Sequence, residues 1–171
     1  MVKKVVAIVQ ARVGSKRLPG KVLKTIEGKP LIEILLYRLS RSKAINTIIL
    51  ATSEHLENDV LATVVETMGY DVFRGSEDDV LARYYHAAKK YRSDIIVRIT
   101  GDCPIIDPQV VDGVVDCFIS NDVDYASNVD PPTYPDGLDV EVFSFSALEN
   151  AHANATSVFD REHVTPFIRD H

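Results

Sequence analysis

Runs of apolar, β-branched residues alternate along the chain with segments whose apolar residues recur at helical spacing. The continuous apolar runs predict strands that are buried on both faces, and they cover residues 5–9, 47–52 and 94–99. The segments with helical spacing predict helices over residues 31–42, 58–68, 76–91 and 107–120. A further short strand is predicted at 71–73. Strands alternating with helices predict an α/β fold, a three-layer α/β/α sandwich around a mostly parallel sheet.

The later part of the chain has a different pattern. Residues 125–127 predict a short strand, and residues 138–145 alternate between apolar and polar positions. This alternation places Asp139 and Glu141 on one face of the same predicted strand, which is costly unless the acids are solvated or neutralised. A capping box that begins at Ser146 predicts a helix to about residue 154. We expect the antiparallel exceptions in the sheet among these later strands.

Composition and charge narrow the class of protein. With 171 residues, no internal repeat and no linker, residues 1–171 are expected to form one domain. A net charge of −6 argues against nucleic acid as a partner. The two cysteines lack metal-type spacing, and no apolar run approaches the length of a membrane span. Since no signal peptide is visible either, a cytoplasmic protein without a membrane partner is expected.

The first predicted strand leads directly into a loop rich in cations and glycine. The loop contains four cations and two glycines, namely Arg12, Lys16, Arg17, Lys21, Gly14 and Gly20. In an open α/β sheet this place is the carboxyl edge of the strand, where ligands bind. Glycines allow close backbone approach, and N–H groups, arginine and lysine suit phosphate oxygens. The loop therefore predicts an anion site, although a solvated basic turn would have the same residue types.

The segment QARVGSKRLPGK, followed by GKPLIE, resembles the cytidylyltransferases that activate sugar acids, the acylneuraminate and 3-deoxy-manno-octulosonate enzymes. It is more similar still to their relatives in spore coat polysaccharide biosynthesis. The Walker and Rossmann glycine motifs are both absent. The resemblance implies a sandwich of the nucleotide-diphospho-sugar transferase type and a homodimer. It also implies transfer of a nucleotide from CTP to a sugar or sugar acid, with release of pyrophosphate.

Roles for individual residues follow from the same resemblance. Arg12 and Lys21 are expected to be catalytic, because they would hold the triphosphate and stabilise the charge that develops on it. The nucleotide is expected to contact Ala11, Arg12, Gly14, Ser15, Lys21, Arg74 and Thr100. The alternative for Arg74 is a structural ion pair with a neighbouring acid of the next loop, Asp78 or Asp79.

A second informative segment, residues 100–104 with the sequence TGDCP, follows the predicted strand at 94–99. A glycine and an acid at a strand end can bring a carboxylate close to a phosphate, and a carboxylate is a suitable ligand for Mg²⁺. The resemblance implies that Asp102 binds the metal and that a second acid, placed here at Asp139, shares it. Mg²⁺ is therefore the expected cofactor. In the octulosonate enzymes a glutamine commonly precedes the glycine, and here that residue is Thr100.

Two other hypotheses remain open at this stage. Asp122 and Asp124 match the D-x-D pattern of metal-dependent glycosyltransferases, so a glycosyltransferase that uses a nucleotide sugar on the same fold is possible. A nucleotide-binding subunit without activity is the other alternative. It gains weight because the chain ends within a predicted helix while the resembled proteins continue, so the domain is expected to be truncated. Residues 161–163 resemble a motif of the spore coat subgroup, without an assigned role.

Overall fold

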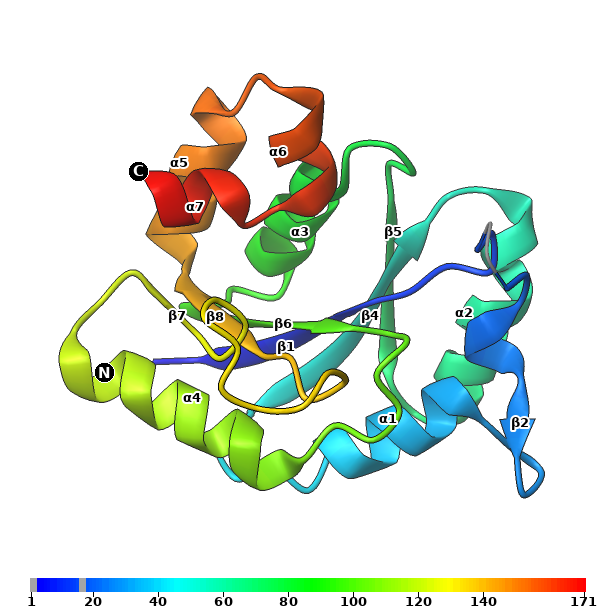
Figure 1. Cartoon of the computed structure of the whole chain (residues 1–171). Helices are drawn as coiled ribbons and strands as arrows, with labels where there is room; N and C mark the ends of the chain where they lie inside the picture. The colour runs from blue at the N-terminus through cyan, green and yellow to red at the C-terminus, as the bar shows by residue number, and fades with distance from the viewer. Residues whose placement is uncertain (1–2, 16–17) are drawn as a thin grey trace.

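A computed structural model describes residues 3–15 and 18–171, so that Lys16 and Arg17 lie outside the described residues. Its centre is a six-stranded sheet with the order β5-β4-β1-β6-β8-β7 (Figure 1). The strands are β1 (Val5–Gln10), β4 (Thr47–Ser53), β5 (Asp71–Gly75), β6 (Ile95–Thr100), β7 (Tyr125–Ser127) and β8 (Glu141–Ser144). The strands β5, β4, β1 and β6 are parallel, whereas β8 is antiparallel to both β6 and β7. The predicted mostly parallel sheet, with its antiparallel exception among the later strands, is confirmed.

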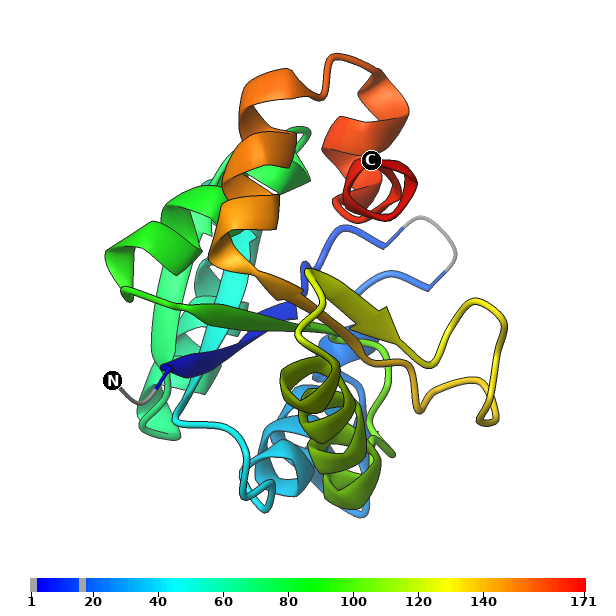
Figure 2. The same ribbon diagram turned by 90° about the vertical axis from the view of Figure 1, so that its left-hand side faces the viewer.

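Helices cover both faces of this sheet, which gives the predicted three layers (Figures 1 and 2). One face packs against α1 (Leu31–Leu39), α2 (Asp59–Thr67) and α4 (Pro108–Asn121). The other face packs against α3 (Val80–Lys90) and α5 (Phe145–Asn154), with α6 (Val158–His163) and α7 (Pro166–Asp170) beyond them. Strand β1 is buried from both sides, because its alternate residues enter the two apolar clusters. This explains its continuous apolar run.

Smaller elements connect these layers. The strands β2 (Thr25–Ile26) and β3 (Lys29–Pro30) form a short hairpin, and 3₁₀ turns lie at Lys21–Leu23 and Leu56–Asn58. Among the described residues, no helix combines the length and apolar character needed to cross a bilayer.

The helix starts at Ser76 and Ser146 were predicted a few residues from where the helices begin. Helix α3 begins at Val80, and the Asp79 carboxylate is its cap, since it accepts from the Ala82 N–H at 2.9 Å. Helix α5 begins at Phe145, capped by the Ser144 hydroxyl, which accepts from the Ala147 N–H at 3.0 Å. In both cases a side chain close to the predicted one serves as the cap. Helix α1 also ends at Leu39, three residues before the predicted end.

The strand predicted over 138–145 is shorter than expected, which changes the environment of its acids. Pairing with β6 and β7 covers only Glu141–Ser144, so Asp139 lies before the strand. The Glu141 carboxylate is buried, forms an ion pair with Arg98 of β6 and accepts from the Tyr125 hydroxyl at 2.7 Å. The expectation of two acids on one strand face was therefore wrong. The two acids therefore have different environments. The Glu141 side chain is buried among residues of the neighbouring strands, whereas Asp139 precedes the strand.

Candidate functional site

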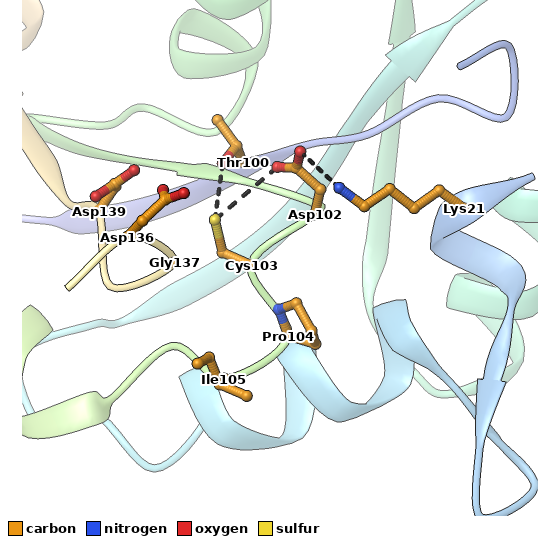
Figure 3. A pocket seen from close by; sticks show the side chains of 9 residues that line it. All are labelled: Lys21, Thr100, Asp102, Cys103, Pro104, Ile105, Asp136, Gly137 and Asp139. Carbon is orange, nitrogen blue, oxygen red and sulfur yellow. Dashed lines mark hydrogen bonds and ion pairs between the residues drawn. The ribbon is translucent and has the colours of Figure 1, made fainter. Parts of the chain in front are cut away.

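A cavity of about 520 Å³ opens at the carboxyl edge of β6 (Figure 3). It is lined by Lys21, Thr100, Asp102, Cys103, Pro104, Ile105, Asp136, Gly137 and Asp139. Strand β1 lies between β4 and β6, and the chain crosses over in opposite directions on its two sides. Ligands of open α/β sheets bind at such a switch point, outside the carboxyl ends of the strands. The cavity thus lies where the fold class places a ligand.

Lys21 and Asp102 form an ion pair on one side of this cavity (Figure 3). The Lys21 Nζ lies 3.1 Å from Asp102 Oδ2, and both side chains remain partly exposed. Burial raises the pKa of Asp102, but Lys21 and the Thr100 hydroxyl outweigh that effect and hold the pKa below its usual value. The carboxylate is therefore ionised near neutral pH and available as an oxygen ligand.

Gly101 brings the two ligand loops into contact. Its N–H donates to the Gln10 carbonyl oxygen at 2.7 Å, across the ends of β6 and β1. A Cβ atom added at Gly101 would lie 2.5 Å from the Cβ of Ala11 and 2.9 Å from the Gln10 oxygen. Only glycine permits this approach. The contact places Ala11 and the start of the cationic loop directly beside Asp102.

Gly101→Ala is expected to destabilise the protein by about 1–3 kcal/mol, because the added methyl group overpacks a contact between two backbones. It should also lower activity by moving Asp102 away from the first loop. Gly113→Ala is the matched control, since Gly113 lies in α4 and an added Cβ there meets nothing within 4 Å. That change should raise stability slightly, by about 0.5–1 kcal/mol. Thermal unfolding of both variants tests the prediction, and equal stabilities would contradict it.

On the other side of the cavity, Asp136 and Asp139 lie beside each other, with Asp102 between them and Lys21 (Figure 3). Burial and the charges of Asp136, Glu141 and Asp102 raise the pKa of Asp139. The cavity therefore has excess negative charge, which a divalent cation would compensate. Within the described parts of the chain, no group of three or more His, Cys, Asp and Glu side chains forms a metal cluster. The carboxylates of Asp102 and Asp139 nevertheless fit Mg²⁺, because this ion usually takes one or two carboxylates together with water and substrate phosphates.

Arg12, Gly14 and Ser15, the other described candidates of the first loop, do not line this cavity. Arg12 forms an ion pair with Glu77, from the loop that follows β5. Gly14 lies beside the exposed side chain of Glu57, and an added Cβ would lie 2.5 Å from Glu57 Oε1. The Ser15 N–H donates to the Val13 carbonyl oxygen at 2.7 Å, which folds the loop back on itself.

Arg74 is not among the residues that line the cavity. Its guanidinium donates to the carbonyl oxygens of Ser53, at 3.1 Å, and His55, at 2.9 Å, and forms an ion pair with Asp59. These contacts hold the loop that follows β4. Arg74 therefore does have an ion pair, but with an acid of α2 rather than with Asp78 or Asp79. Its contact with a nucleotide remains a prediction.

The two acids of the D-x-D pattern lie at the opposite edge of the sheet from Asp102. Asp124 accepts from the Ser144 hydroxyl at 2.6 Å, and Ser144 pairs with Ile95, the first residue of β6. Asp102 follows the last residue of that same strand. Asp122 is the C-cap of α4 in the left-handed region, with φ 51°. The glycosyltransferase hypothesis therefore lacks a metal pair at the cavity.

Sequence reasoning missed two polar residues that hold the first loop. Asn58 is fully buried; its Oδ1 accepts from the Val13 N–H and its Nδ2 donates to Ser53 Oγ, both at 2.8 Å. Glu77 holds Arg12 from the other side. From sequence, Asn58 was only the first residue of a predicted helix, and Glu77 was not singled out. Neither has a local signal, because both act on a segment more than 40 residues away.

Both the sequence and the fold of this chain match known proteins. The cytidylyltransferase family model matches residues 6–171. The chain is 46% identical over 165 residues to an uncharacterized protein of Methanocaldococcus jannaschii, covering 96% of this chain and 67% of that protein. It is 33% identical over 174 residues to the spore coat polysaccharide biosynthesis protein SpsF of Bacillus subtilis, covering 96% of this chain and 69% of that protein. A solved cytidylyltransferase from Leptospira borgpetersenii superposes with a TM-score of 0.94 at 37% identity, covering 99% of this chain and 72% of that one.

Proposed function

Because this chain belongs to the cytidylyltransferase family and is a nucleotidyltransferase, we propose that it activates a sugar or sugar acid with CTP, in the presence of Mg²⁺. A hydroxyl oxygen of the acceptor attacks the α-phosphorus, and the bond from that phosphorus to the β-phosphate oxygen breaks. The products are the cytidylylated sugar and pyrophosphate. A polysaccharide pathway is the proposed use of the product, by analogy with the SpsF relative.

The observation that supports this function is the convergence of three distant segments on one cavity. Lys21, Asp102 and Asp139 line the same space, although they are far apart in the sequence. A cation and two carboxylates at the ligand edge suit a triphosphate that binds together with a divalent ion.

In this proposal the protein contributes positioning and charge rather than covalent chemistry. Lys21 and Arg12 hold the phosphates and stabilise the charge that develops as pyrophosphate leaves. The backbone from Ala11 to Ser15 borders the nucleotide, with Thr100 nearby. Asp102 and Asp139 hold Mg²⁺, which neutralises phosphate charge when bound. The loop of residues 130–137, which contributes Asp136 and Gly137 to the cavity, borders the acceptor.

The test is pyrophosphate release from CTP and Mg²⁺ with a panel of sugars and sugar acids, with ATP, GTP and UTP as competing nucleotides. Turnover with CTP and one acceptor is the expected result. CTP binding without turnover across the panel would instead support a nucleotide-binding subunit. Sugar transfer from a finished nucleotide sugar would support a glycosyltransferase. Preference for another nucleotide would overturn the assignment of the base.

Arg12→Ala is expected to weaken CTP binding by about tenfold or more, since an arginine that contacts phosphate contributes a charge-assisted hydrogen bond. Titration calorimetry with CTP and Mg²⁺ measures this directly. Arg41→Ala is a suitable control, because Arg41 is an exposed cation beyond the end of α1. Unchanged CTP affinity in Arg12→Ala would count against its phosphate role.

A homodimer is also part of the proposal, and it rests on the family resemblance alone. Light scattering should give the mass of two chains at working concentrations. A monomer at every concentration would remove this element without affecting the proposed reaction.

A further inference from the structure

The loop between β5 and α3, residues 76–79, extends over the end of β4 to the first loop. Its central acid, Glu77, pairs through Oε1 with Arg12 Nη1. The Glu77 side chain is only 13% exposed, whereas the Arg12 side chain is 47% exposed. The acid is therefore fixed inside the protein, while part of the guanidinium still faces solvent.

Two further arginines hold this loop in place. The Arg83 Nη1 donates to the carbonyl oxygen of Ser76, and Arg83 itself is buried. Arg161 of α6 forms a two-pronged contact with Asp79, with its Nε 3.0 Å from Oδ1 and its Nη2 2.5 Å from Oδ2. Such bidentate pairs are strong and directional. The loop that carries Glu77 is therefore held at both ends, by Arg83 at Ser76 and by Arg161 at Asp79.

Among the described residues, Arg12 is the partner that forms an ion pair with Glu77. Its second oxygen, Oε2, is buried and accepts no hydrogen bond from the described residues. Burial raises the pKa of Glu77, but the Ser53 hydroxyl and the charges of Arg12 and Arg83 lower it below its usual value, so the acid stays ionised. Loss of the Arg12 contact would leave this mostly buried carboxylate without the ion pair that the structure shows for it, which is costly. The contact with Arg12 should therefore persist when a nucleotide binds.

We propose that Glu77 is the positioning residue of the nucleotide site: it holds the Arg12 guanidinium in one orientation, ready for the triphosphate of CTP. This inference rests on the proposed function. A guanidinium has five N–H donors, so those not used by Glu77 remain available for phosphate oxygens. A free arginine on a loop would lose side-chain entropy on binding phosphate, whereas one already held by Glu77 has lost it on folding. Arg161 contributes indirectly, because it anchors the loop that presents Glu77.

The experiment measures CTP binding calorimetrically with Mg²⁺ and without acceptor, followed by steady-state kinetics. Glu77→Gln removes the charge and keeps the shape, and CTP affinity should fall roughly tenfold. The KM for the acceptor should stay unchanged, which a general loss of structure would not produce. Asp78→Asn is the matched control, because this exposed acid is the next residue of the same loop, and CTP affinity should remain that of the wild type. Glu77→Asp, which keeps the charge one methylene further back, should lie between Gln and the wild type.

A double-mutant cycle separates positioning from other effects. In the Arg12→Ala background, Glu77→Gln should change CTP affinity less than twofold, because the group that Glu77 positions is gone. An equal loss in both backgrounds would overturn the inference, and so would unchanged or tighter CTP binding by Glu77→Gln alone. Should Glu77→Gln fail to fold, Glu77→Asp is carried through the same cycle with the same criteria. A wild-type protein that binds no CTP overturns the proposed function as well, whereas normal CTP turnover with no Glu77 effect overturns this inference only.

Discussion

Replacing Lys21 with alanine is expected to lower kcat for CTP-dependent pyrophosphate release by about 10²–10³-fold. Among the described residues that line the cavity, Lys21 is the only cation, and its Nζ lies beside Asp102. A cation at that place would stabilise charge that develops only as the phosphate bond breaks. The loss should therefore fall on kcat more than on the KM for CTP.

The fold should survive this change, because Lys21 begins a 3₁₀ turn and its side chain is partly exposed. Lys24→Ala is the matched control: Lys24 is an exposed lysine three residues further on and does not line the cavity. It should keep wild-type kinetics. Circular dichroism and thermal unfolding accompany the assay, and a Lys21→Ala protein that unfolds without a specific kinetic defect would refute the assignment.

Substitution of the two proposed metal ligands is expected to lower turnover about as much as Lys21→Ala does. Asp102→Asn and Asp139→Asn should each reduce turnover by about 10²-fold or more, because each removes one carboxylate from a shared ion. The double variant should be little worse than either single variant, since the same ion is lost in each case. Activity should disappear in chelator and return with Mg²⁺ or Mn²⁺.

Asp116→Asn, a change at an exposed acid of α4, controls for the loss of one negative charge. Additive losses in the double variant would mean that the two carboxylates act independently and share no ion. Full activity in Asp139→Asn would remove this residue from the metal site, and Asp136, its neighbour in the cavity, would then be the next residue to test.

The local patterns of the sequence were sufficient for the layers of the fold and for the ligand edge. Strand β1 is a continuous apolar run because helices cover both its faces, and such a run is visible without a structure. The residues that follow a parallel strand must lie at its carboxyl edge, so Lys21 and Asp102 could be placed together from sequence. The pattern of residues 138–145, together with the resemblance, added Asp139, and the three residues do line one cavity. Their chemical roles remain predictions.

The tertiary structure decided the partners of the charged residues. Glu141 pairs with Arg98 inside the sheet, and Glu77 pairs with Arg12 across the end of β4. Such pairs depend on strand order and register, here β5-β4-β1-β6-β8-β7, which no local pattern encodes.

Strand order and direction also explain why Asp124 and Arg74 do not line the cavity. Asp124 and Asp102 both lie near strand ends, but Asp124 precedes β7, which runs in the same direction as β6, whereas Asp102 follows β6. Asp124 therefore lies at the edge opposite the cavity. Arg74 was predicted to follow a strand, but it lies within β5, and the loop after β4 binds its guanidinium. Sequence alone determined which segments form the central strands, because the burial of a strand is visible in its local hydrophobic pattern. Which ends face each other depends on contacts between segments far apart in the chain, and only the folded sheet decides them.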